Sequence, residues 1–291
     1  MSAENPVIAV VIPVGPQRHH ARWLDACLIS IARQSRLPNF ILIVDDMADV
    51  ELPDLSRQVG GDKLPEIIKY SPPWRLGVAH AFNHGVAKAF EHGADLALML
   101  GADDLLETRV VEALAQTYLK RDGRDGYYWS EVLYSGGEID GHHQTVPCNC
   151  AAVTPGVWRE TGGFPVESAH GACDAAFISI LMIHKPSWLV HVPGMPSSRF
   201  IHRLHDQQAT RDGAPGINAV RGWLTDRYVP TEWVGMPEIL YKQRCPYCDE
   251  GTAASPSKGG SMFNRDTHIA SCERAPKREQ EKAKGRVHWS D

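Results

Sequence analysis

The feature that most limits how this chain can fold is an apolar run that stops at two adjacent carboxylates. Residues 96–100 read Leu-Ala-Leu-Met-Leu, and Asp103 and Asp104 follow after two small residues. A continuous apolar run of this length is typical of a strand buried on both faces of a parallel sheet. Open α/β sheets bind their ligands at the carboxyl ends of such strands. We therefore expect Asp103 and Asp104 at the mouth of an open α/β sheet.

Strand-like and helix-like segments alternate along the first half of the chain. Apolar runs predict strands at residues 7–12, 40–44 and 96–100, and a further strand at 127–133. Apolar residues at helical spacing predict helices over residues 22–34, 79–89, 106–114 and 172–183. This order predicts a parallel sheet with right-handed crossovers and helices on its faces.

Bulk properties exclude several classes of protein. The 291 residues suffice for one large domain with a small appendage, and the net charge of −5 provides no global basic field for nucleic acid or membranes. No apolar run approaches the ~20 residues of a membrane span, and no signal peptide is recognisable. We therefore expect a cytoplasmic protein without a membrane partner. The seven cysteines indicate thiols and metal binding rather than a disulfide framework.

A second acid pair, Asp45 and Asp46, ends the strand predicted at 40–44. Adjacent parallel strands would place both pairs on one rim, where one could recognise a nucleotide base or ribose while the other holds a metal ion. Two structural alternatives remain. Asp104 with Glu107 fits a capping box for the following helix, and Asp45 or Asp46 could simply start a turn.

Seven short motifs, taken together, resemble the family-two glycosyltransferases of the GT-A fold. They occur in the family's order over about the first 210 residues. The motifs are Val-Ile-Pro-Val at 11–14, Ile-Val-Asp-Asp at 43–46, Gly77 with Asn83 and Gly85, Ala-Asp-Asp at 102–104, Gly-Gly-Phe at 162–164, Cys-Asp-Ala-Ala at 173–176 and Arg-Leu-His-Asp-Gln-Gln at 203–208.

The resemblance implies a Rossmann-like α/β domain that binds a nucleotide-diphosphate sugar. It implies a nucleotide-sugar site formed by Pro13, Val14, Asp45, Asp46, Asn83, Ala102, Asp103 and Arg203. By the same resemblance, Asp103, Asp104 and His205 hold Mn²⁺ or Mg²⁺, which neutralises the departing diphosphate. Asp174 falls on the family's catalytic base, which takes the proton of the acceptor hydroxyl in an inverting displacement. The alternative for Asp174 is a helix-start residue stabilised by the helix dipole. The sequence does not identify the sugar or the acceptor.

Three positions depart from the family pattern. Gly101 stands where the first acid of the metal-binding Asp-x-Asp is usual, Phe82 replaces a common Arg before Asn83, and Cys173 replaces a Glu before Asp174. The missing acid leaves Asp103 and Asp104 to share the metal. These departures keep open a second hypothesis, in which a degenerate transferase-like domain accompanies a zinc protein that binds nucleic acid or protein.

The strongest local signal lies near the C-terminus. Cys245 and Cys248 form a Cys-x2-Cys pair, and after nineteen residues His268 and Cys272 form a His-x3-Cys pair. These four ligands suit a structural, tetrahedral Zn²⁺. The segment resembles Cys-Cys-His-Cys zinc fingers, which implies nucleic acid or protein as its partner. Its basic surroundings could form a phosphate-contacting surface, and the alternative is a solvated tail. The acceptor of the transferase could be a modified DNA base, a protein or a glycan. We expect four regions: a transferase domain at 1–230, a linker at 231–242, a zinc module at 243–275 and a charged disordered tail at 276–291.

Overall fold

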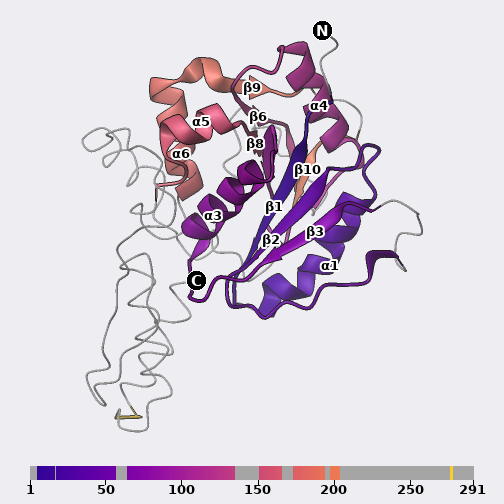
Figure 1. Ribbon diagram of the computed structural model, residues 1–291, viewed down its shortest axis with the longest axis vertical. Coiled ribbons are helices and arrows are strands. Elements are labelled where there is room, and N and C mark those ends of the chain that lie inside the picture. Colours follow the sequence, from indigo (N-terminus) through magenta and orange to yellow (C-terminus); the bar gives the residue numbers. More distant parts are fainter. Residues whose placement is uncertain are drawn as a thin grey trace.

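The chain forms a central sheet that helices cover on both faces (Figure 1). The computed structural model describes residues 5–16, 18–56, 64–134, 151–165, 173–193, 197–203 and 276–277. The helices are α1 (Arg18–Ala32), α3 (Val78–Glu91), α4 (Val110–Lys120), α5 (Pro155–Thr161) and α6 (Cys173–His184). A short 3₁₀ turn covers Pro186–Trp188.

The large sheet has the strand order β3-β2-β1-β4-β8-β6-β9. Its strands are β1 (Ile8–Val14), β2 (Phe40–Asp45), β3 (Glu66–Tyr70), β4 (Leu96–Met99), β6 (Tyr127–Trp129), β8 (Ala151–Val153) and β9 (Leu189–His191). β3, β2, β1 and β4 run parallel, while β8 is antiparallel to both β4 and β6. The mostly parallel α/β sheet expected from the sequence is confirmed.

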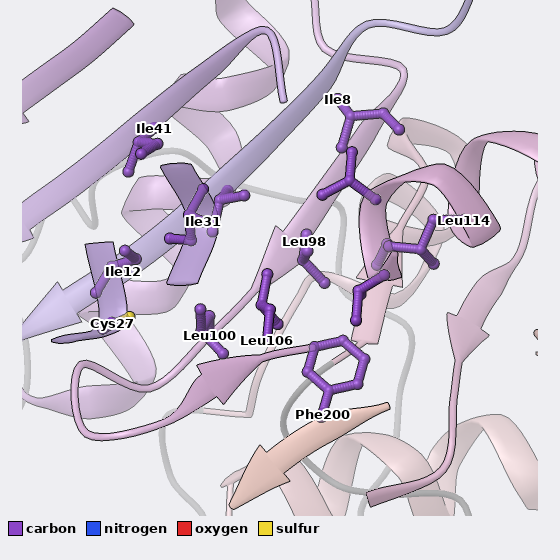
Figure 2. Packing of buried hydrophobic residues seen from close by; sticks show 14 of the residues in the cluster. Ile8, Ile12, Cys27, Ile31, Ile41, Leu98, Leu100, Leu106, Leu114 and Phe200 are labelled. Atoms are coloured by element: carbon purple, nitrogen blue, oxygen red, sulfur yellow. The ribbon is translucent and has the colours of Figure 1, made fainter. Parts of the chain in front are cut away.

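Alternate residues of β1 build two different cores, because successive side chains of a strand point to opposite faces. Ile8, Val10 and Ile12 pack in the core beneath α1 and α4. Figure 2 shows part of this core, where Cys27 and Ile31 of α1 approach the sheet. Ala9 and Val11 pack in the core beneath α3, α5 and α6. Burial on both faces explains why β1, β2 and β4 read as unbroken apolar runs.

A smaller sheet brings a distant segment to the acid motif. It consists of β5 (Leu105–Leu106), β10 (Phe200–His202) and β7 (Val132–Tyr134), with β10 in the middle. Ile201 of β10 pairs with Leu105, one residue beyond Asp104. The Glu107 carboxylate also accepts hydrogen bonds from the Arg199 side chain at 2.9 and 3.1 Å. Residues 202 and 203 therefore lie beside residues 103 and 104.

Two element predictions were wrong, and several elements were missed. Leu106 belongs to strand β5, and the helix α4 begins at Val110, because pairing with β10 takes the preceding residues. The strand predicted at 127–133 is two strands, β6 and β7, which belong to different sheets. The edge strand β3 was missed, since its exposed and half-buried residues do not form an apolar run.

The described residues contain no helix that is both long and apolar enough to cross a membrane. Most of the segment from residue 204 onward, with His205 and the four predicted zinc ligands, lies outside the described residues. The predicted division into four regions and the zinc module therefore stay predictions.

Candidate active site

The carboxylate of Asp45, at the end of β2, shapes the loop that follows. It is buried, accepts N–H bonds from Ala48 at 2.8 Å, Asp49 at 3.1 Å and Val50 at 3.0 Å, and pairs with Lys69 at 2.8 Å. Burial acts to raise the pKa of Asp45, but the Lys69 bond and the backbone N–H groups outweigh it and lower the pKa. The contacts of Asp45 thus match the turn alternative considered from the sequence.

Asp46 joins the end of β2 to the start of α3. Its buried carboxylate accepts the backbone N–H groups of Leu76 and Gly77, the second at 2.8 Å. Burial raises the pKa of Asp46, and these two N–H groups offset that only in part. A carboxylate at this place also interacts favourably with the positive end of the α3 dipole. Asp46 therefore fixes where α3 begins relative to the sheet.

The second acid pair folds over a glycine. A Cβ placed on Gly101 would lie 2.8 Å from Oδ1 of Asp103 and 3.0 Å from Oδ2 of Asp104. Both carboxylates therefore face one place, and the lack of a side chain at residue 101 leaves that place open to them. The capping-box alternative for Asp104 and Glu107 does not match the geometry, because α4 begins only at Val110 and Glu107 binds Arg199.

Asp104 also holds the end of β10. Its other oxygen, Oδ1, accepts bonds from Nδ1 of His202 at 3.0 Å and from the backbone N–H of Arg203 at 3.1 Å. Nε of Arg203 donates to the carbonyl of Asp103 at 2.8 Å, and its guanidinium lies 4.0 Å from the ring centroid of Trp23 on α1. An indole face attracts a cation at this range. Two positively polarised groups are thus held beside the acid pair.

The negative charges near His202 change the pKa of its imidazole. Burial acts to lower its pKa, but the bond to Asp104 and the negative charges of Asp104, Asp103 and Asp174 outweigh burial and raise the pKa. Asp174, half-buried in the first turn of α6, contributes the smallest of these charge effects. The structure brings Asp103 and Asp104 together with His202 and Arg203, whereas Asp45 and Asp46 bind their own loop and helix start.

The other predicted nucleotide-sugar residues occupy varied positions. Pro13 is half-buried at the end of β1, while the side chains of Val14 and Ala102 are buried in the core beneath α1 and α4. Any contact of Val14 or Ala102 with a ligand would therefore involve backbone atoms. The side chain of Asn83 binds the backbone of Phe164.

The acid pair fits one side of a divalent-cation site. Two carboxylates converge above Gly101, and hard oxygen ligands suit Mn²⁺ or Mg²⁺. Among the described residues, no group of three or more His, Cys, Asp or Glu side chains could hold a metal ion. A full ligand set would thus need His205 or the substrate's own oxygens, and His205 lies outside the described residues.

Sequence reasoning missed His202 and Trp23. His202 carries no motif of its own, and the only hint was its place one residue before the Arg203–Gln208 motif. Trp23 lies on a helix predicted from its apolar face, and nothing in a sequence pairs it with a side chain 180 residues away. Trp158 is a core residue beside Phe164 and Phe177.

A cavity of about 250 Å³ between α3 and α5 lies elsewhere. Its walls include Phe90, Trp158 and Arg159, so it lies at the end of α3 opposite to Gly77 and Asp46. It is therefore separate from the acid pairs.

Solved structures share this fold at low sequence identity. Staphylococcus aureus (S. aureus) TarS 1–349 in complex with UDP-GlcNAc has a TM-score of 0.52 and 10% identity, covering 96% of this chain and 71% of that chain. A structure of S. aureus TarS has a TM-score of 0.51 and 10% identity, covering 76% of this chain and 43% of that chain. Another of TarS 1–349 has a TM-score of 0.51 and 11% identity, with coverages of 67% and 60%. This chain thus spans less than two thirds of the last two.

The likeness establishes the class of fold, which is a GT-A-like glycosyltransferase fold. No protein-family model and no curated protein matches the chain.

Proposed function

We propose that this chain is an inverting glycosyltransferase that uses a nucleotide-diphosphate sugar. The observation that supports it most is the convergence of Asp103 and Asp104 with His202 and Arg203 in a GT-A-like fold. Asp174, in the first turn of α6, is the candidate base of the acceptor side. TarS, which shares this fold, has been solved in complex with UDP-GlcNAc, so a uridine diphosphate sugar is the first donor to test.

In this proposal, the site residues divide the reaction between two sides. On the donor side, Asp103 and Asp104, with His205, would hold Mn²⁺ or Mg²⁺, and a bound cation supplies charge neutralisation for the departing diphosphate. Arg203 is held beside the same acids by the carbonyl of Asp103 and by Trp23. It would add a second positive charge near the leaving group.

On the acceptor side, Asp174 would act as general base. The acceptor oxygen forms a bond to the anomeric carbon while the bond from that carbon to the diphosphate oxygen breaks. The acceptor proton passes to the Asp174 carboxylate, and the nucleoside diphosphate leaves with the electron pair. Because the displacement is single and in line, the anomeric configuration inverts.

The test is Mn²⁺-dependent binding of UDP, followed by turnover of a panel of nucleotide sugars. We expect Asp103→Ala to weaken both, and Asp174→Asn to abolish turnover while UDP still binds. Asp25→Asn is the matched control, because Asp25 is an exposed carboxylate on α1. If the wild-type chain neither binds a nucleotide with metal nor turns over any donor, the proposal is wrong.

We also propose a structural Zn²⁺ held by Cys245, Cys248, His268 and Cys272, supported by their spacing alone. A module of this kind would recruit nucleic acid or protein. If the transferase reading fails, salt-sensitive DNA binding that Cys245→Ser removes would support the alternative function, that of a zinc protein with a degenerate transferase-like domain.

A further inference from the structure

Asn83 on α3 uses both ends of its amide on one distant residue. Its Nδ2 donates to the carbonyl of Phe164 at 2.9 Å, and its Oδ1 accepts the N–H of Phe164 at 2.8 Å. The two residues are 81 positions apart in the sequence. A paired bond of this kind fixes both distance and orientation, and so it attaches the turn at residues 162–164 to α3.

Phe82 strengthens the same attachment through its ring. Its centroid lies 5.5 Å from that of Phe164, and the two rings are inclined by 78°, an edge-to-face contact. This is the position at which the family pattern commonly has an Arg. An apolar contact with the 162–164 turn therefore stands where a cationic side chain would be usual.

The turn is shaped to receive Asn83. Gly163 has a φ of 79°, and a Cβ there would lie 2.8 Å from Oδ1 of Asn83 and 2.9 Å from Cζ2 of Trp158. A side chain at residue 163 would thus be strained and would also push against the Asn83 amide. The glycine of this motif is explained by the approach of Asn83.

From Phe164 the contacts continue to the helix that carries Asp174. The rings of Phe164 and Phe177 have centroids 5.3 Å apart, and Phe177 is three residues after Asp174 on α6. Residues three apart on a helix are neighbours on its surface. The side chain of Cys173, at the start of α6, is buried in the same core. The first turn of α6 is therefore packed against the residue that Asn83 holds.

We propose that Phe82 and Asn83 form a positioning clamp, which holds Phe164 and through it the first turn of α6 with Asp174. The clamp acts on the acceptor half of the site. Because both ends of the Asn83 amide bind Phe164, we assign Asn83 to positioning instead of the nucleotide contact that the resemblance implied. The effect of the clamp on catalysis rests on the function proposed above, in which Asp174 is the base. Loss of the clamp should leave nucleotide binding intact and lower the rate of transfer.

The first measurement is hydrogen–deuterium exchange on the full chain, which needs no substrate. In Asn83→Ala, we expect amides in 162–165 and 173–177 to exchange at least tenfold faster, while peptides covering 40–46 and 96–104 stay unchanged. The matched control is His84→Ala, which removes one hydrogen bond to Tyr70 from the same helix. Phe82→Leu is a milder variant that keeps an apolar side chain, and it serves if Asn83→Ala does not fold.

The second measurement separates binding from chemistry. We expect UDP with Mn²⁺ to bind Asn83→Ala within threefold of the wild-type affinity, while turnover of UDP-GlcNAc, or of whichever donor the panel identifies, falls at least tenfold at saturating donor. A merely structural role would lower the unfolding temperature without this split. Unchanged exchange in 162–177 overturns the clamp, as does a collapse of UDP affinity in Asn83→Ala. If the wild-type chain binds no nucleotide, the proposed function falls, whereas the exchange result still decides whether the clamp exists.

Discussion

Replacing Gly101 by alanine tests whether Asp103 and Asp104 need the space beside the Gly101 Cα in order to share a metal ion. The new Cβ would lie 2.8 Å from Oδ1 of Asp103 and 3.0 Å from Oδ2 of Asp104, while ordinary contacts begin at 3.4 Å. Each oxygen must retreat by several tenths of an ångström. Because both atoms are ends of short side chains, we expect the free energy of unfolding to change by less than about 1 kcal/mol.

The effect on metal binding should be much larger than the effect on stability. Metal–oxygen distances tolerate changes of only about 0.2 Å, so a retreat of both carboxylates spoils a shared ligand geometry. We expect the affinity of the full chain for Mn²⁺ to fall at least about tenfold, which is about 1.4 kcal/mol. Gly101→Asp should do the same despite adding the acid that the family usually has there, because its Cβ meets the same oxygens.

The assay is titration of the protein with Mn²⁺, followed by electron paramagnetic resonance or calorimetry, together with urea unfolding of each variant. Gly101→Ala that binds Mn²⁺ as tightly as the wild type would refute the idea that these carboxylates share a cation. A gain of affinity in Gly101→Asp would show instead that the family's usual acid can be restored, and that the glycine is a simple loss.

Three further outcomes follow from the packing, the titration and the cysteine motif. A Cβ at Gly85 would clash with Cγ1 of Val11, so Gly85→Ala should lower the free energy of unfolding in urea by about 1–3 kcal/mol. Val11→Ala in the same chain should recover part of this loss, and strictly additive effects of the two substitutions would contradict this packing. Burial and the nearby charge of His84 lower the pKa of His80 to about 4. Because the unfolded chain takes up this proton already near pH 6.5, the free energy of unfolding falls as the pH drops from 6.5 toward 4, by up to about 3 kcal/mol. In urea unfolding, the free energy of unfolding of His80→Leu should fall less than that of the wild type between pH 7 and 5. An equal fall in both proteins would count against this burial. Metal analysis should find one Zn²⁺ per chain that Cys245→Ser removes, and a zinc-free wild type would reject the module.

The sequence was sufficient to predict β1, β2 and β4 of the parallel sheet, for a physical reason. These strands are covered on both faces, so all their residues except Asp45 are apolar and the runs are conspicuous. The short strands β7, β9 and β10 have three residues each, and their pairing partners are distant in the chain. Their existence depends on tertiary contacts that no local pattern records.

The sequence predicted which acids lie at the ends of the strands, but not which groups each carboxylate contacts. The acid pairs at 45/46 and 103/104 look alike in the sequence, since each follows a buried strand. The difference lies in what the backbone offers next. The loop after β2 presents N–H groups to Asp45, and Leu76 with Gly77 presents two more to Asp46, so both carboxylates are bound by their surroundings.

After β4 the chain instead turns tightly over Gly101, and each acid keeps an oxygen directed at the place above that glycine. β10 then supplies the imidazole of His202, which binds the Asp104 carboxylate, and the next residue, Arg203, supplies a guanidinium that binds the Asp103 carbonyl. These residues are about 100 positions away in the sequence. Coulombic attraction alone would not select this segment over other segments that carry cationic side chains. The pairing of Ile201 with Leu105 selects it, because this register places His202 and Arg203 beside the acids. The small sheet is thus the element that converts a common acid motif into a site with both signs of charge, and its register is the part of the fold on which the donor side most depends.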